Sequence, residues 1–156
     1  MIQVESYLRN KDGTFVPVED ATIVPDDPIH IDGAMALRIV GVDIIDLDMW
    51  DLVDQLWAYI ADMIGSLKET GTAQTHFPDQ PIELKFQRDK GGRVVVTSTP
   101  SRGMRKAIIG EQELINSLRD AGLKFFHKMS LLVPANAATY QIYADKLSAL
   151  PIRRSR

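Results

Sequence analysis

Residues 48–71 read DMWDLVDQLWAYIADMIGSLKETG, and this stretch decides how the rest of the chain is interpreted. From Trp50 onward, apolar side chains recur at steps of three and four residues, a spacing that places them on one face of a helix. Asp48 is suited to cap the helix, and Gly71 is suited to end it. The stretch therefore predicts a central helix over residues 48–68 that is buried on most sides. Its narrow polar stripe consists of Asp51, Asp54, Gln55, Ala58 and Asp62.

The chain before this helix shows the period of two that is typical of strands. Lys11-Asp12-Gly13 predicts a tight turn, because Asp and Gly tolerate the backbone angles that hairpins need. Residues 19–28 contain two prolines and four acids, so we expect a surface loop there. Strands are predicted at residues 2–8, 14–18 and 29–45, the last one broken at Asp32-Gly33 and near Gly41.

The chain after the helix returns to the strand pattern and then changes to helix. Residues 70–81 are polar and close on two prolines, which predicts a loop. The run Arg88-Asp89-Lys90-Gly91-Gly92 predicts a hairpin turn. The three valines that begin at Val94 predict a strand buried on both faces. Strands are predicted at residues 82–87, 93–99 and 104–109, and helices at 111–131 and 136–149.

Strands on both sides of one helix, with further helices at the end, predict an α+β fold. We expect a single domain over residues 1–150, with a mainly antiparallel sheet of about five or six strands. The two long helices and a C-terminal helix are expected to pack on one face of that sheet. The basic residues 151–156 are expected to form a tail outside the domain. The predicted core includes Trp50, Trp57, Ile60, Ile64, Val95, Phe125 and Phe126.

Composition excludes several classes of protein. The 156 residues contain no cysteine, which excludes disulfides, thiolate metal sites and a cysteine nucleophile. The first residues lack the charged head and apolar run of a signal peptide. No stretch approaches the roughly 18 apolar residues of a membrane span. We therefore expect a cytoplasmic protein that has no membrane partner.

Charge is distributed unevenly along a chain whose net charge is only −3. Six aspartates and no lysine or arginine lie between Arg38 and Lys68. An acidic surface favours encounter with a basic partner, although helix capping and solvation account for the same residues. We expect Asp51, Asp54 and Asp62 to point outward from the central helix. The predicted binding surface, for a basic protein, consists of Asp43, Asp46, Asp51, Asp54 and Asp62.

Residues 85–106 form a second candidate surface, because they hold seven bases and one acid. A nucleic-acid-binding module that uses this hairpin is an alternative function. Phe86 is its only aromatic residue, so no stacking platform accompanies the charge. The acidic net charge of the chain also argues against nucleic acid as a partner.

Glu83 and Lys85 give the sharpest hint of catalysis. On a strand they share a face, as in nucleases whose Glu-x-Lys holds a divalent metal and activates water. Such a site also needs an upstream aspartate, for which Asp43 and Asp46 are the candidates. We predict no enzymatic activity and no cofactor, and a metal-dependent nuclease is the alternative. No metal-binding spacing links the three histidines, His30, His76 and His127.

Two stretches, Leu47–Trp57 and Phe77–Leu84, together with the Phe125-Phe126 helix, resemble small bacterial proteins. Some of these are similar to immunity proteins that neutralise polymorphic or contact-dependent toxins. The resemblance covers residues 40–133. It implies a cytosolic, non-enzymatic inhibitor that covers the active site of a toxin. The acidic residues are compatible with a basic nuclease toxin.

Overall fold

Nine strands form two antiparallel sheets in the computed structural model, which describes residues 1–150. One sheet has the order β2-β1-β3-β4, with β5 paired to β3. Its strands are β1 (Ile2–Arg9), β2 (Phe15–Pro17), β3 (Asp32–Ile39), β4 (Val42–Ile45) and β5 (Asp51–Leu52). The other sheet has the order β6-β7-β8-β9. Its strands are β6 (Thr72–His76), β7 (Glu83–Arg88), β8 (Arg93–Thr99) and β9 (Arg105–Gly110).

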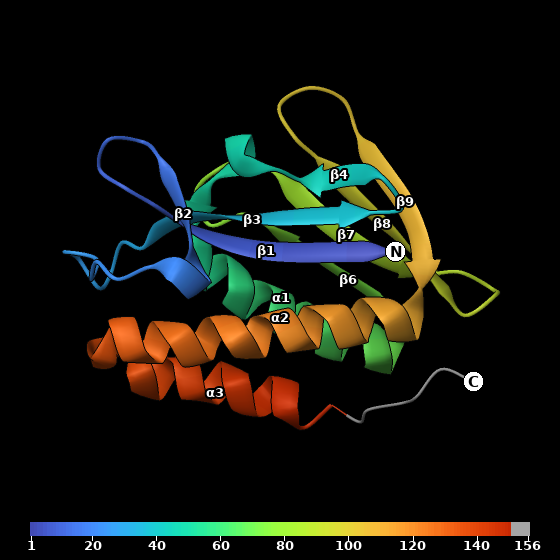
Figure 1. Ribbon diagram of the computed structural model, residues 1–156. Coiled ribbons are helices and arrows are strands. Elements are labelled where there is room, and N and C mark those ends of the chain that lie inside the picture. Colours follow the sequence, from blue (N-terminus) through green and yellow to red (C-terminus); the bar gives the residue numbers. More distant parts are fainter. Residues whose placement is uncertain (151–156) are drawn as a thin grey trace.

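Three α-helices gather on one side of the strands, and α3 packs against α2 on the outside (Figure 1). They are α1 (Val53–Thr70), α2 (Glu111–Leu132) and α3 (Ala137–Ser148). Short 3-10 turns are η1 (Val18–Asp20), η2 (Leu47–Met49) and η3 (Pro134–Asn136). The predicted α+β fold with three helices is confirmed. None of the helices within residues 1–150 has the length and apolar character to cross a membrane.

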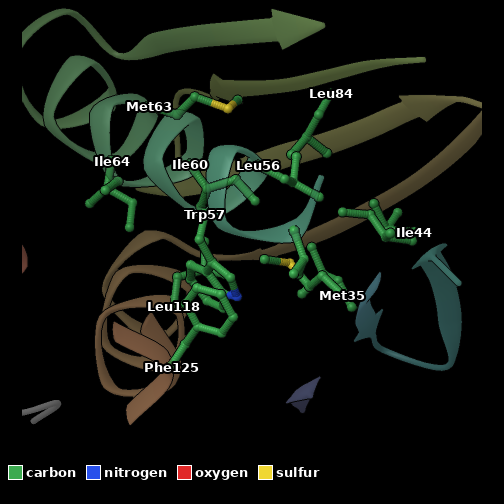
Figure 2. Close-up of a cluster of buried hydrophobic side chains, with 14 of the residues drawn as sticks. Met35, Ile44, Leu56, Trp57, Ile60, Met63, Ile64, Leu84, Leu118 and Phe125 are labelled. Atoms are coloured by element: carbon green, nitrogen blue, oxygen red, sulfur yellow. The ribbon is translucent and has the colours of Figure 1, made fainter. Parts of the chain in front are cut away.

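The helix α1 lies at the centre of the core, because apolar side chains surround most of its circumference. Trp57 is fully buried, and its indole N–H donates to Oγ of Ser6 on β1 over 2.9 Å. Its ring stacks on Phe125 of α2, with 5.8 Å between the ring centroids. Gly71, with a φ of 80°, ends α1 as predicted. Figure 2 shows that α1 also packs against both sheets, through Met35, Ile44 and Leu84.

The two sheets meet where β4 lies beside β9 (Figure 1). Ser98 of β8 donates its hydroxyl to the carbonyl oxygen of Ile44 in β4 over 2.6 Å. The guanidinium of Arg105 in β9 donates to the Asp43 carbonyl and to the Asp46 carboxylate, each over 2.8 Å. Side chains therefore join the sheets here, and within residues 1–150 no ladder of backbone hydrogen bonds pairs β4 with β9.

The arrangement of the strands differs from the single sheet that the sequence predicts. Two sheets form because α1 separates them along the chain and packs against strands of each. The strand β6 lies inside the predicted 70–81 loop, so that part of the loop prediction is wrong. Its residues are mostly polar, and Ala73, opposite Phe86 of β7, is the one that is buried. A strand with one inward apolar residue gives almost no period-two signal.

The start of the central helix also differs from the prediction. The helix begins at Val53, and Asp48 lies instead in η2, where its N–H donates to the carboxylate of Asp46 over 3.0 Å. Trp50 lies before the helix and is half-buried, with the Arg9 guanidinium 4.1 Å above its ring centroid. Trp50 is therefore not a member of the core.

Two further strand predictions require correction. The strand β3 begins at Asp32, so residues 29–31 are not part of a strand and Asp32-Gly33 marks its start and not a break within it. A Cβ at Gly33 would lie 2.2 Å from the Tyr7 carbonyl oxygen. Glycine permits a close approach of β1 here, and the break falls at Val40-Gly41, whose φ angles are 48° and 80°. Val95 is half-buried, so β8 is fully buried on one face only.

Candidate functional site

Asp51, one of the predicted binding residues, is buried with only 3% of its surface exposed. It lies in β5, before α1, and its carboxylate accepts hydrogen bonds from three backbone N–H groups. These belong to Leu52 at 2.7 Å, Asp79 at 3.1 Å and Gln80 at 2.9 Å. The prediction that Asp51 points outward is therefore wrong. Its carboxylate fixes the segment between β6 and β7 against the start of the helix.

Asp54 also faces the interior of the molecule more than predicted. Its carboxylate accepts a hydrogen bond of 2.8 Å from the hydroxyl of Tyr140 on α3. Burial raises the pKa of the Asp54 carboxyl, although the Tyr140 hydroxyl and the Gln55 backbone N–H lower it in part. Burial likewise raises the pKa of the Tyr140 hydroxyl. This pair joins α1 to α3, and the Asp54 side chain is half-buried between them.

The other three predicted carboxylates form ion pairs within the chain. Asp43 pairs with Arg38 over 2.7 Å, Asp46 with Arg105 over 2.8 Å, and Asp62 with Lys146 over 2.9 Å. Each pair partly neutralises the charge that a basic partner would meet. Asp43 and Asp62 remain exposed, but the five residues do not form one continuous acidic surface of free carboxylates.

Glu83 and Lys85 lie on β7 as the sequence predicts, but the structure gives Glu83 a different neighbour from the predicted aspartate. The Glu83 carboxylate lies 3.6 Å from Nε2 of His76, directly opposite on β6. Asp46 is held instead by Arg105. Within residues 1–150, no group of three or more histidine and carboxylate side chains is placed to hold a metal ion.

The basic hairpin 85–106 is partly neutralised. Arg88 forms an ion pair of 2.6 Å with Glu111 at the start of α2, and Arg93 pairs with Asp89 over 3.3 Å. Lys85 and Lys106 occupy one cross-strand row, on either side of Thr97 in β8. These two lysines give the outer face of the sheet a small basic area without an aromatic side chain beside it.

The loop between η1 and β3 exposes large apolar side chains among acids. Ile23 is 77% exposed and Ile29 is 73% exposed, and Val24 is exposed between them. Exposed apolar side chains that gather in one region are a common feature of binding sites. We call this region the 19–32 surface; its exposed residues are Glu19, Asp20, Thr22, Ile23, Val24, Asp26, Asp27, Pro28, Ile29, His30 and Asp32.

A hollow of about 880 Å³ lies beside this loop, between it and the β1–β2 hairpin. Ile23 and Val24 line one side, and Lys11 and Asp12 of the hairpin line the other. Lys11 forms an ion pair with Asp26 that bridges the two sides. A hydrogen bond from the Thr14 hydroxyl lowers the pKa of Asp12, and one from Lys11 lowers the pKa of Asp26. Both carboxylates therefore stay ionised at neutral pH.

The loop is held in place at several points along its length. Asn136, between α2 and α3, donates its side-chain amide to the Pro28 carbonyl over 2.7 Å. The Asp27 carboxylate accepts from the N–H of Ile29 over 2.9 Å, and the Ile31 carbonyl accepts from the N–H of Val53 over 3.0 Å. The apolar side chains are thus presented by a supported backbone, which lowers the entropic cost of binding.

The sequence carries a signal for the 19–32 surface, although the aspartates between Arg38 and Lys68 predict a different binding surface. Residues 19–28 are predicted as a surface loop from their prolines and acids, and that prediction is confirmed apart from the short turn η1. Two large apolar residues within a predicted surface loop, Ile23 and Val24, are the feature that points to a binding site.

Comparisons with known protein families, curated proteins and solved structures find no match to this chain.

Proposed function

We propose that this chain is a non-enzymatic protein-binding domain and that its 19–32 surface binds a basic protein partner. Following the resemblance to immunity proteins, the partner is a toxin domain, and the chain neutralises that toxin in the bacterial cytoplasm. The proposed acidic binding site is the loop before β3. The carboxylates of Asp51, Asp54 and Asp62 are not proposed, because each is buried or bound within the chain.

The exposure of Ile23, Val24 and Ile29 is the observation that carries the proposal. Each side chain contributes roughly 1.5–3 kcal/mol when it is moved from water into an apolar environment. Three such side chains on one supported loop provide the apolar centre of an interface. The surrounding carboxylates then form its polar rim.

The charge around this apolar centre selects a basic partner. Asp20, Asp27 and Asp32 are exposed, and of the bases nearby Lys11 is paired with Asp26 while Lys128 donates to the Glu19 carbonyl. A surface of one sign accelerates association with an opposite charge, and salt reduces this effect because the Debye length is about 10 Å at 0.1 M and about 3 Å at 1 M.

The test uses the protein encoded directly beside this chain, purified as an inactive variant, with affinity measured by titration calorimetry. Ile23→Asp and Ile29→Asp should each weaken binding by about ten-fold or more, because they place a charge in the apolar centre. Asp20→Lys with Asp32→Lys should slow association, most strongly at low salt. The active toxin should lose its activity when the wild-type chain is added in equal amount.

Met104→Asp is the matched control, because Met104 is a similarly exposed apolar residue in the loop between β8 and β9. It should leave affinity and association rate unchanged. Equal losses in Met104→Asp and Ile23→Asp would show that the 19–32 surface is not the interface. Binding that survives both isoleucine substitutions would reject this surface as well.

A further inference from the structure

One edge of β1 is only partly covered. On one side, β3 pairs with β1 from Ile2 to Leu8. On the other side, β2 pairs only with Tyr7, Leu8 and Arg9, and the chain then turns away into η1. The edge from Ile2 to Ser6 therefore has no strand beside it within residues 1–150.

The direction of the backbone groups on this edge follows from the neighbouring hydrogen bonds. The N–H of Val40 donates to the carbonyl of Met1 over 2.9 Å on the β3 side, and the N–H of Asn10 donates to the carbonyl of Thr14 over 2.7 Å on the β2 side. Hydrogen-bonding direction alternates along an antiparallel strand. The backbone groups of Ile2 and Val4 therefore point to the open edge, whereas the Ser6 carbonyl faces Val18, which follows β2.

A groove of about 500 Å³ runs along this edge, between β1 and α2. Ile2 and Val4 line it from the strand, Val18 from η1, and Ala121 and Phe125 from the helix, which also contributes the charged residues Asp120, Lys124 and Lys128. The helix therefore leaves room beside the strand. A strand edge with unpaired N–H and carbonyl groups is a template for the backbone of another strand.

The groove specifies the side chains of such a strand as well as its backbone. A residue opposite Val4 would direct its side chain toward Ala121 and Phe125, because directly paired residues share a face of the sheet. An apolar side chain fits this position. A residue opposite Glu5 would lie on the outer face near the exposed Glu5 carboxylate. Glu19 lines the same groove. A basic side chain fits there.

We propose that the Ile2–Ser6 edge of β1 is a strand-addition site that binds an extended protein segment of alternating apolar and basic residues. The segment lies beside β1 beyond the end of β2, pairs its backbone with Ile2 and Val4, and places its apolar side chains in the groove beside α2. Glu19 borders both this groove and the 19–32 surface, but the other contacts of the segment come from the backbone of β1 and from α2, so the two sites can be tested separately.

The edge itself is tested first, on the free protein, by native-state hydrogen exchange. The amides of Val4 and Ser6 should exchange quickly, and those of Gln3 and Glu5 should be protected by β3. Equal protection of Val4 and Glu5 would show that the edge is already covered, and would overturn the proposal.

Binding is tested with an acetylated and amidated heptapeptide of alternating lysine and valine, titrated into the isotope-labelled full chain. Chemical shifts should change at Ile2, Val4, Ser6 and Ala121 and should saturate at a millimolar concentration of peptide or below. The same peptide with proline in place of its central valine should bind at least about ten-fold more weakly, because proline lacks the donor. A peptide of alternating glutamate and valine should also bind more weakly.

Two variants act on the site in different ways. Val4→Pro removes an edge donor without removing a bond to β3, and Ala121→Phe fills the groove without changing the strand. Each should weaken peptide binding by about ten-fold while the folded state is retained. Unchanged binding in Ala121→Phe, or shifts confined to β6 or to the 19–32 surface, would overturn the proposal. A dimer of the free protein that Val4→Pro dissociates would assign the edge to a second copy of the chain instead.

Discussion

The hydroxyl of Tyr140 donates to the carboxylate of Asp54 over 2.8 Å and so links α3 to α1. Asn136 donates in turn to the Tyr140 hydroxyl over 3.1 Å. The link therefore extends to the residue that also holds Pro28 of the 19–32 surface. The interior of the helical layer and the presentation of the loop are connected through one short chain of hydrogen bonds.

Tyr140→Phe should lower the free energy of unfolding by about 1–2 kcal/mol at neutral pH, because a half-buried carboxylate loses its donor. Denaturant unfolding measures the change. Tyr143→Phe is the matched control, since Tyr143 contacts Phe126 and Lys146 through its ring. Removal of the Tyr143 hydroxyl should change stability by less than about 0.5 kcal/mol. Equal effects of the two substitutions would mean that the Asp54 hydrogen bond contributes nothing.

The raised pKa of Asp54 predicts a specific pH dependence. Burial raises the folded-state pKa above the unfolded value, so the folded state binds the proton more tightly. This contribution to stability is complete below the unfolded pKa and is lost as pH rises through the folded pKa. The stability of the wild type relative to Asp54→Asn should therefore fall as pH rises from the unfolded pKa of an aspartate through the folded pKa.

Asp12→Asn supplies a control of opposite sign for this experiment. Hydrogen bonds from Thr14 lower the pKa of Asp12, so its contribution is present above the unfolded pKa and is lost as pH falls through the folded pKa. The stability of the wild type relative to Asp12→Asn should therefore rise with pH at the acidic end. Parallel slopes for the two variants would contradict the assignment of the Asp54 shift to burial.

Asp51→Ala should cost about 3 kcal/mol or more, because three backbone donors lose a buried acceptor. Hydrogen exchange should also accelerate in the segment between β6 and β7, which this carboxylate holds. Asp62→Ala removes an exposed ion pair with Lys146 and should cost less than about 1 kcal/mol. A small effect at Asp51 would mean that the segment is held by its other contacts, such as the one between Gln80 and the Trp50 carbonyl.

Two glycines should respond in opposite directions to the same substitution. Gly33→Ala places a Cβ 2.2 Å from the Tyr7 carbonyl oxygen and 2.7 Å from Cγ1 of Val53, so β3 must shift and stability should fall. Gly65→Ala meets nothing within 4 Å on α1 and should stabilise the protein by about 0.5–1 kcal/mol through helix propensity. Thermal unfolding of both variants checks this. A neutral Gly33→Ala would show that β1 and β3 are not packed this closely.

Periodicity was sufficient to predict most elements of the fold. The rows of apolar residues in α1 and α2 predict those helices, because a helix that faces a core repeats its apolar positions at 3.6 residues. The β7–β8 hairpin follows from its Asp-Lys-Gly-Gly turn. Local pattern does not show that α1 divides the strands into two sheets, since this depends on contacts between distant residues such as Ser98 and Ile44.

The candidate site was harder to predict, because charge in the sequence does not reveal its partners in space. Asp51 and Asp62 look alike in the sequence, yet one is buried against backbone donors and the other is paired with Lys146 on a different helix. The local sequence pattern also does not predict the open edge of β1, because this edge depends on the residue at which β2 stops pairing with β1. The sequence shows that Ile23 and Ile29 are apolar, but only the structure shows that their side chains are exposed.

The contact between β4 and β9 has a mechanical consequence. Within residues 1–150, Ser98 and Arg105 connect the two sheets there through side chains, and the ladders of each sheet end at this line. The connection along this line can therefore be weakened by substitutions of two side chains, without the loss of any ladder hydrogen bond. Arg105 makes most of this connection, because a single guanidinium reaches the Asp43 carbonyl, the Asp46 carboxylate and the sulfur of Met49.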